Sequence, residues 1–405
     1  MKFVHIADCH LGSWREPKLR EINNNAFISV IDFCIKKEID FLVIAGDLFN
    51  TALPSIDSIK LAVCQLKRLK DKKIPVYAIA GSHDFSPSGK TMLDVLENAG
   101  LLIDVSRGET VEGKLKLKFT EDMKTGIKLT GLLGKKGGLE KNYYYDLHRE
   151  NLENEKGYKI FLFHSAITEL KTKELSNMES MPLSLLPKGF NYYAGGHVHI
   201  VDQKNFKEYY NVIYPGPIWP NSFSELEKLG QGGFVFVENG KAEQMKIEPK
   251  TVISVKINVE NKNATEAEQE IIDGFKEESI KDSVITLRVE GCLRKGKITE
   301  INFKKIFEDL YAKGVHFVMK NTSGLKTKEF EEMKIKESSA EEIENNLIEE
   351  HSGQLKIFEK EKEKELTKEL LQMFSVEKNE GEKNSDFEKR IKEMVDSVIM
   401  ETSST

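Results

Sequence analysis

The amino-acid sequence predicts an α/β protein in which a layered first domain is followed by a small α+β domain and a helical C-terminal tail. Three observations support this prediction. Short apolar runs alternate with helical patterns over residues 1–248, a similar alternation restarts over 249–325, and residues 326–405 are rich in Lys and Glu. Strands that alternate with helices are typical of α/β layers. The chain has 405 residues, which suits two or three domains.

The first domain contains six candidate strands, each a short apolar run with β-branched or aromatic members. They are residues 3–7, 41–45, 76–80, 160–163, 192–194 and 234–237. Two amphipathic helices are expected between the first three strands, because apolar residues recur there at helical spacing. These residues are Phe27, Val30, Ile31 and Cys34 in one helix, and Ile59, Val63 and Leu66 in the other.

The second domain restarts the alternation after Pro249. Strands are expected at 252–259, 284–289 and 315–319, with helices at 264–275 and 300–311 between them. This pattern predicts a small α+β domain of ordinary size.

The tail, residues 326–405, carries two apolar stripes at helical spacing. The first is Leu366, Leu370, Leu371 and Phe374, and the second is Phe387, Ile391, Met394, Val395 and Val398. The polar segment 377–385 separates them, so we expect a helix-loop-helix. Such helices could pack on their own chain, stay unfolded or dock on a partner. We favour docking, because the stripes follow a polar linker.

Charge is unevenly distributed along the chain. The net charge is −6 at pH 7, and residues 326–405 hold 14 Lys and Arg against 22 Asp and Glu. The acidity therefore belongs to the tail, and the nearly neutral remainder can still present a local basic face to phosphates.

Cysteine usage and hydropathy favour a reducing, aqueous compartment. The four cysteines show no CxxC spacing, which favours free thiols over disulfides or a zinc knuckle. No apolar run of about eighteen residues is present, and the N-terminus lacks the layout of a signal peptide. We expect a cytoplasmic protein without a membrane span.

Five segments place His or Asp directly after a candidate strand. They contain Asp8 and His10, Asp47, His83 and Asp84, His164, and His197 and His199. The carboxyl ends of strands converge on one crevice in open α/β architectures, so these side chains are expected to meet. Imidazole and carboxylate groups together suit manganese, iron or zinc. One short motif is weak support, but five in order predict a metal centre.

The series Asp8-x-His10, Gly46-Asp47, Gly81-x-His83-Asp84, His164 and Gly196-His197-x-His199 resembles the calcineurin-like metallophosphoesterases. More narrowly, His10-Leu11-Gly12, Gly46-Asp47-Leu48-Phe49-Asn50 and the small second domain resemble the SbcD and meiotic recombination eleven nucleases of double-strand-break repair. The resemblance implies a layered β-sandwich phosphoesterase domain flanked by helices (1–248), an α+β capping domain (249–325) and a partner-docking tail (326–405).

The resemblance also implies a ligand set for two Mn²⁺ ions. The first ion is assigned to Asp8, His10, Asp47 and His199, and the second to Asp47, Ser82, His164 and His197, so that Asp47 bridges the two ions. His83 would protonate the leaving group or steady the transition state, with Asp84 orienting it. Ser82 departs from the family pattern, which has Asn there. Its shorter side chain could ligate directly, act through a water, or serve only as a turn residue.

The expected substrate is DNA, at duplex ends and in single strands. Candidate phosphate contacts are Arg15, Lys90, Lys135 and Lys136, of which the loop with Lys135 and Lys136 is the best candidate. Base rates favour an inert surface role for any single one of them. The resemblance implies an SbcC-like SMC-type ATPase as partner, bound through residues 355–405, and a cytoplasmic location at the nucleoid. It also implies a homodimer formed by helices near 55–69 and 91–98. Leu93 and Leu96 could form that interface or lie in the core.

Two other functions fit parts of the sequence. One is a phosphodiesterase or phosphatase of the same superfamily acting on a smaller substrate, against which the extra domain and tail argue. The other is a DNA-end-binding scaffold whose catalysis is weakened at Ser82. The otherwise complete set of Asp and His residues argues against that scaffold.

Overall fold

The computed structural model describes residues 1–86, 91–172, 175, 178–275, 280–328, 340–352, 359–376, 378 and 384–403. The chain divides into two compact units. The first comprises Met1–Ser254, Ile280–Thr286 and Lys313–Met319, and the second comprises Val255–Ser279, Leu287–Ala312 and Lys320–Thr405. Within the described residues, no helix is long and apolar enough to cross a membrane.

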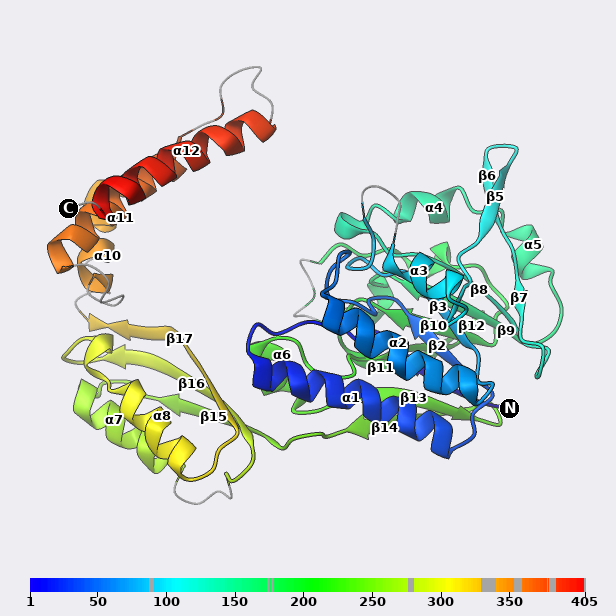
Figure 1. The fold of residues 1–405 in the computed structure, drawn as a ribbon, viewed down its shortest axis with the longest axis horizontal. Helices are drawn as coiled ribbons and strands as arrows, with labels where there is room; N and C mark the ends of the chain where they lie inside the picture. The colour runs from blue at the N-terminus through cyan, green and yellow to red at the C-terminus, as the bar shows by residue number, and fades with distance from the viewer. Residues whose placement is uncertain are drawn as a thin grey trace. The chain divides into compact units, whose positions relative to one another are not determined.

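The first unit is built on two six-stranded sheets (Figure 1). The first sheet has the order β14-β13-β1-β2-β3-β4. Strands β1 to β4 are parallel, and β13 pairs antiparallel with β1. Its members are β1 (Lys2–Ile6), β2 (Phe41–Ala45), β3 (Val76–Ile79), β4 (Ile103–Asp104), β13 (Gly232–Glu238) and β14 (Lys241–Ile247).

The second sheet has the order β11-β12-β10-β9-β8-β7, and its centre, β12-β10-β9-β8, is parallel. Its members are β7 (Thr120–Glu121), β8 (Lys128–Leu132), β9 (Lys159–His164), β10 (Tyr192–Gly196), β11 (Val201–Phe206) and β12 (Tyr209–Pro215). All six strands predicted for the first domain are therefore present.

The inner faces of the two sheets pack on each other. Phe3, Val43 and Ile79 of the first sheet share one buried cluster with Ile160 and Tyr192 of the second. Each such side chain, once fully buried, contributes about 1.5–3 kcal/mol of hydrophobic stabilisation. The two sheets thus form the expected β-sandwich.

Helices cover the outer face of the first sheet, where α1 (Pro17–Lys36) and α2 (Ile56–Asp71) lie side by side (Figure 1). The apolar positions predicted for α1 are all buried there. Two shorter helices, α3 (Met92–Asn98) and α6 (Phe223–Leu229), complete this layer. Leu93 and Leu96 of α3 are buried against the sheet, so they belong to the core.

The outer face of the second sheet is covered by short elements and loops. These are the hairpin β5 (Gly108–Val111) and β6 (Lys114–Leu117), the helices α4 (Lys141–Tyr145) and α5 (Glu150–Glu153), and 3₁₀ turns at Lys136–Gly138, Thr168–Leu170 and Leu183–Leu185.

A three-stranded sheet follows in the chain, in the order β15 (Val252–Asn258), β16 (Val284–Leu293), β17 (Phe317–Thr327). Helices α7 (Ala264–Asp273) and α8 (Phe303–Ala312), with a 3₁₀ turn at Ile298–Glu300, connect its strands. This is the strand-helix-strand-helix-strand pattern predicted from the sequence.

The tail contains α10 (Ala340–His351), α11 (Lys360–Phe374) and α12 (Asn384–Ser403). The two helices predicted from the apolar stripes are α11 and α12, which contact each other, whereas α10 was not predicted. Most of the predicted loop between the stripes lies outside the described residues. Leu371 and Phe374 remain 39% and 63% exposed, so part of the first stripe is available to a partner.

Candidate metal centre

The predicted ligands converge because their strands end at the same edge of the sandwich. Asp8 and His10 follow β1, Asp47 follows β2, and His164 is the last residue of β9. Ser82 and His83 follow β3, while His197 and His199 follow β10. All five strands are parallel within their sheets, so their carboxyl ends deliver these residues together, as expected.

The loops that carry these residues adopt uncommon backbone conformations. Asp8, His10, Asp47, His197 and His199 all have positive φ, between 43° and 99°. Side chains other than glycine rarely adopt this conformation, and such strain concentrates at functional sites whose surroundings hold it in place.

Two glycines allow the loops to approach closely. A Cβ at Gly46 would lie 2.2 Å from Nδ1 of His164, and one at Gly81 would lie 2.2 Å from Oδ1 of Asp47. Any larger residue would therefore push a predicted ligand out of place.

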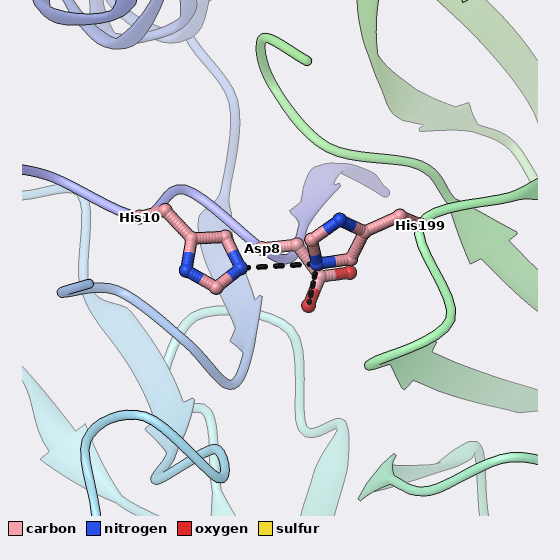
Figure 2. A group of neighbouring side chains, drawn as sticks. All are labelled: Asp8, His10 and His199. Atoms are coloured by element: carbon pink, nitrogen blue, oxygen red, sulfur yellow. Dashed lines mark hydrogen bonds and ion pairs between the residues drawn. The ribbon is translucent and has the colours of Figure 1, made fainter. Parts of the chain in front are cut away.

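The first group of ligand atoms comes from Asp8, His10 and His199 (Figure 2). Nε2 of His199 lies 3.0 Å from Nε2 of His10 and 3.8 Å from Oδ1 of Asp8. The ligand atoms of the three residues lie within 4.8 Å of one another, as the assignment of the first metal ion requires.

Asp47 lies between this group and a second one. Its Oδ2 is 3.7 Å from Nε2 of His10 and 3.1 Å from Nε2 of His164. Asp8, Asp47 and His164 form a further set of possible ligands. Asp47 thus contacts one imidazole from each predicted ion site, which is the position of a bridging carboxylate.

The two other ligands predicted for the second ion, His197 and Ser82, lie less close to the remaining ligand atoms. The ring centroid of His197 lies 5.1 Å from that of His164. The backbone amide of His197 donates a hydrogen bond to Oδ1 of Asp8 at 2.9 Å. Among the described residues, His197 belongs to none of the close ligand groups. Ser82 is buried, with its Oγ 3.5 Å from Oδ2 of Asp47. The ligand atoms predicted for the second ion are therefore gathered less closely than those predicted for the first.

We expect Ser82→Asn to tighten Mn²⁺ binding at the second site, because an amide oxygen reaches about 1.5 Å further than the hydroxyl. Calorimetric titration of both proteins measures this, and changes close to a metal ligand typically alter affinity by about 10 to 100-fold. Equal or weaker second-site affinity in the variant would show that the loop is adapted to serine.

The residues fit divalent cations. Asp8 and Asp47 are both 1% exposed, and two buried carboxylates so close together need a compensating cation. Nδ1 of His10 is buried without a hydrogen bond, and Nε2 of His164 faces the Asp47 carboxylate. Carboxylate oxygens and imidazole nitrogens suit Mn²⁺, Fe²⁺ or Zn²⁺.

The pKa shifts reflect the same electrostatic demand. Burial alone would lower the pKa of His164, but the charge of Asp47 and then of Asp8 raise it to about 10. Burial alone would raise the pKa of Asp47, yet His164 and His10 hold it well below its usual range. Burial lowers the pKa of His10 and of His197 to about 3. The carboxylates therefore favour a proton on His164, and, against the effect of burial, Asp8 favours one on His199 by raising its pKa to about 9. Metal binding must displace those protons.

Hydrogen bonds on the far side of three imidazoles fix their orientation. Nδ1 of His164 lies 2.8 Å from the carbonyl oxygen of Ala45, and Nδ1 of His83 lies 2.8 Å from that of Asn50. Nδ1 of His199 lies 3.1 Å from Oε1 of Glu225. A proton held at Nδ1 leaves the Nε2 lone pair free.

Glu225 and the carbonyl of Asn50 are not among the site residues predicted from the sequence. Ser222 and Glu225 have the spacing of a helix start, and the Ser222 hydroxyl does accept the Glu225 amide. That signal locates α6 but does not place it beside His199. A backbone carbonyl has no sequence signature.

Asp84, predicted to orient His83, has other partners in the structure. Its carboxylate accepts the amides of Leu48, Phe49 and Gly81, at 2.9–3.2 Å, while Nδ1 of His83 contacts the carbonyl oxygen of Asn50. These bonds tie the loop after β2 to the loop after β3. Burial, and then the charge of Asp47, raise the pKa of Asp84 to about 7. Asp84 therefore supports the backbone around Asp47 and His83.

The predicted DNA contacts differ in availability. Arg15 and Lys136 are exposed. The ammonium of Lys135 lies 2.6 Å from the hydroxyl of Tyr143 and packs over the ring of Phe85, so it braces the loop that carries His83. Lys90 lies outside the described residues.

A cleft of about 410 Å³ opens at the ligand cluster. Its lining includes Asp47, Ser82, His83, His197 and His199, together with Ser224, Glu225, Lys228 and several apolar residues. A larger hollow, about 600 Å³, lies at the start of β3, the opposite strand end. None of the predicted ligands lines it, so we place the chemistry in the smaller cleft.

Comparison with known proteins agrees with this geometry. The calcineurin-like phosphoesterase family matches residues 1–201. The chain is 28% identical to the DNA double-strand break repair protein Mre11 of Archaeoglobus fulgidus, over 76% of this chain and 75% of that protein. It is 31% identical to the protein of the same name from Methanococcus maripaludis, over 58% of this chain and 61% of that protein. It is 24% identical to the protein of the same name from Thermoplasma acidophilum, over 76% of this chain and 79% of that protein.

Proposed function

The chain belongs to the calcineurin-like phosphoesterases, in the group of SbcD and Mre11 nucleases, and we propose that it cleaves DNA during double-strand-break repair with two Mn²⁺ ions. One observation carries the proposal: three groups of possible ligands overlap, with Asp8 in two of them and Asp47 in two of them, beside a cleft that Asp47 lines. Divalent ions held there would supply Lewis-acid activation of water and phosphate.

The chain itself contributes the positioning and the proton. Asp47 holds the amide of His83 at 2.7 Å, so the ligand loop and His83 move as one unit. The carbonyl of Asn50 accepts the proton on Nδ1 of His83, so the doubly protonated imidazole would give its second proton, on Nε2, to the departing oxygen. This assigns His83 the role of general acid.

We propose that duplex ends are degraded exonucleolytically and that single strands are cut internally. The relatives' printed names support DNA as the substrate, as do the exposed cations Arg15 and Lys136. End-labelled linear duplex and closed single-stranded circles, incubated with Mn²⁺, test the two activities separately. If the single-stranded circles stay intact, the proposed endonuclease activity is contradicted and the proposed exonuclease activity is unaffected.

The smaller-substrate alternative rests on the size of the cleft, about 410 Å³, which one nucleotide would fill. The extra sheet formed by β15, β16 and β17 and the three tail helices have no use in that alternative. We therefore prefer DNA.

We also propose a homodimer through α2 and α3, in a protein located at the nucleoid. Leu93 and Leu96 are in the core, but Leu53 just before α2 and Ile56 at its start are 85% and 82% exposed, and Val95 of α3 is 55% exposed. Exposed apolar groups in one region favour association. The mass of the protein in solution decides between monomer and dimer.

We propose that the tail binds an SbcC-like SMC-type ATPase. Leu371 and Phe374 of α11 are exposed, while the second stripe on α12 is half-buried. An exposed apolar helix face suits docking in a groove of a partner.

Deleting residues 355–405 should leave Mn²⁺-dependent cleavage of a short substrate within about twofold and abolish binding to the ATPase. The reason is that the ligands all lie before residue 200, in the first unit. Pull-down with the purified ATPase measures the binding. Leu371→Asp with Phe374→Asp provides a version without truncation, and Lys362→Asp serves as control on the same helix. Full-strength capture of the truncated protein would end the docking proposal.

A further inference from the structure

The acidic side chain of Glu225 lies behind the first ligand group, outside the predicted ligand set. One of its oxygens, Oε1, is 3.1 Å from Nδ1 of His199. The opposite nitrogen of that ring, Nε2, faces His10 and Asp8, at 3.0 Å and 3.8 Å (Figure 2). We infer that Glu225 is a positioning residue, which holds His199 in the tautomer and orientation that bind the first metal ion. This inference rests on the proposed metal-dependent function.

The second oxygen of Glu225 is also in use. Oε2 accepts the amide of Asn221 at 2.9 Å, and the amide of Glu225 donates to Oγ of Ser222 at 3.2 Å. These contacts at the first turn of α6 therefore hold the carboxylate in place independently of His199. A group that is already held by its own helix orients a ligand more strictly than a free side chain does.

The start of α6 is itself anchored to the loop of the first ligand motif. Trp219 is fully buried, and the carbonyl of Pro220 accepts Nε1 of Trp14 at 3.2 Å. Trp14 follows His10 in the same loop. The geometry therefore joins His10, His199 and Glu225 through one rigid path.

The chemistry requires this help because His199 has a choice of tautomers. Its backbone has a φ of 49°, and its ring would bind a cation only with the proton on Nδ1. A carboxylate at Nδ1 selects that tautomer and makes Nε2 a stronger donor. In His164 and His83, the Nδ1 nitrogen instead contacts a backbone carbonyl oxygen. Only His199, among these three, receives a charged acceptor.

Glu225→Gln tests the inference with little change of shape. The amide has one acceptor oxygen for two N–H donors, those of His199 and Asn221, so the variant must lose one bond or favour the wrong tautomer. We expect Mn²⁺ affinity at one site to fall by about 10 to 100-fold, as measured by calorimetry on the metal-free protein. Glu227→Gln, on the same helix, is the matched control and should bind as the unmodified protein does.

A second experiment separates positioning from a general structural effect. If Glu225 acts only through His199, Glu225→Gln should change Mn²⁺ affinity less than twofold in a His199→Ala background. The visible spectrum of bound Co²⁺ should also differ between Glu225→Gln and the unmodified protein, and unfolding midpoints confirm that each variant folds.

Unchanged affinity in Glu225→Gln, or an equal loss with and without His199, would overturn the inference. No DNA enters these measurements. If the protein binds Mn²⁺ as described but leaves DNA intact, the proposed nuclease activity is contradicted. The inferred role of Glu225 is then unaffected.

Discussion

His83→Ala should bind two Mn²⁺ ions with unchanged affinity and lose DNA cleavage by about 100 to 10,000-fold, the range for removing a positioned acid or base. The imidazole is anchored by Asn50 through Nδ1, and the ligand assignment does not need its Nε2. The loop should survive the substitution, because the bond from the residue 83 amide to Asp47 belongs to the backbone. Calorimetry and cleavage rates on labelled duplex give the two readouts.

The result is informative because His83 lies close enough to be a ligand. Its ring is 4.7 Å from that of His10, and it forms a possible ligand group with His10 and Asp47. Loss of an ion from His83→Ala would make it a ligand and remove it as the acid. Partial rescue of cleavage by added imidazole would support proton transfer, and His148→Ala, at a distant surface histidine, provides the control.

Asp47→Asn should weaken both Mn²⁺ sites by at least about 100-fold, the upper range for disturbing groups around a metal ligand. The carboxylate contacts His10 on one side and His164 on the other. The fold should tolerate the change, because Asn adopts the φ of 53° found at Asp47 more readily than most residues. Its oxygen can still accept the His83 amide.

Thermal unfolding distinguishes this variant without any substrate. Added Mn²⁺ should raise the unfolding midpoint of the unmodified protein, since an ion that binds only the folded state stabilises it. The midpoint of Asp47→Asn should not respond, while Asp202→Asn, whose carboxylate pairs with Lys204, should respond normally. A full response in Asp47→Asn would contradict the bridging assignment.

The six strands predicted for the first domain are buried along most of their length. Strand β2 is buried at every position, as is β9, so their apolar runs are unbroken. The edge strands β11 and β14 are mostly exposed and carry residues such as Lys204 and Glu243. No apolar alternation marks them, because the edge of a sheet needs few buried side chains.

The same contrast applies to the site. Ligands that follow strand ends are predictable, since strand direction carries them to one edge. The orientation of each imidazole depends on contacts such as His199 with Glu225, between distant loops. Asp84 follows His83 in sequence, yet its carboxylate turns towards the amides of Leu48 and Phe49. Proximity in sequence therefore did not determine which group orients His83.

Stepwise addition of Mn²⁺ to the metal-free protein most directly tests whether Asp8 and Asp47 anchor a two-metal nuclease. One assay uses end-labelled duplex DNA as substrate, and a separate assay uses a small chromogenic phosphodiester. We expect Mn²⁺-dependent shortening of the labelled strand, abolished by chelation and by Asp47→Asn, with slower cleavage of the small ester. Cleavage of the small ester with intact DNA, or DNA cleavage that survives both chelation and Asp47→Asn, would contradict the account.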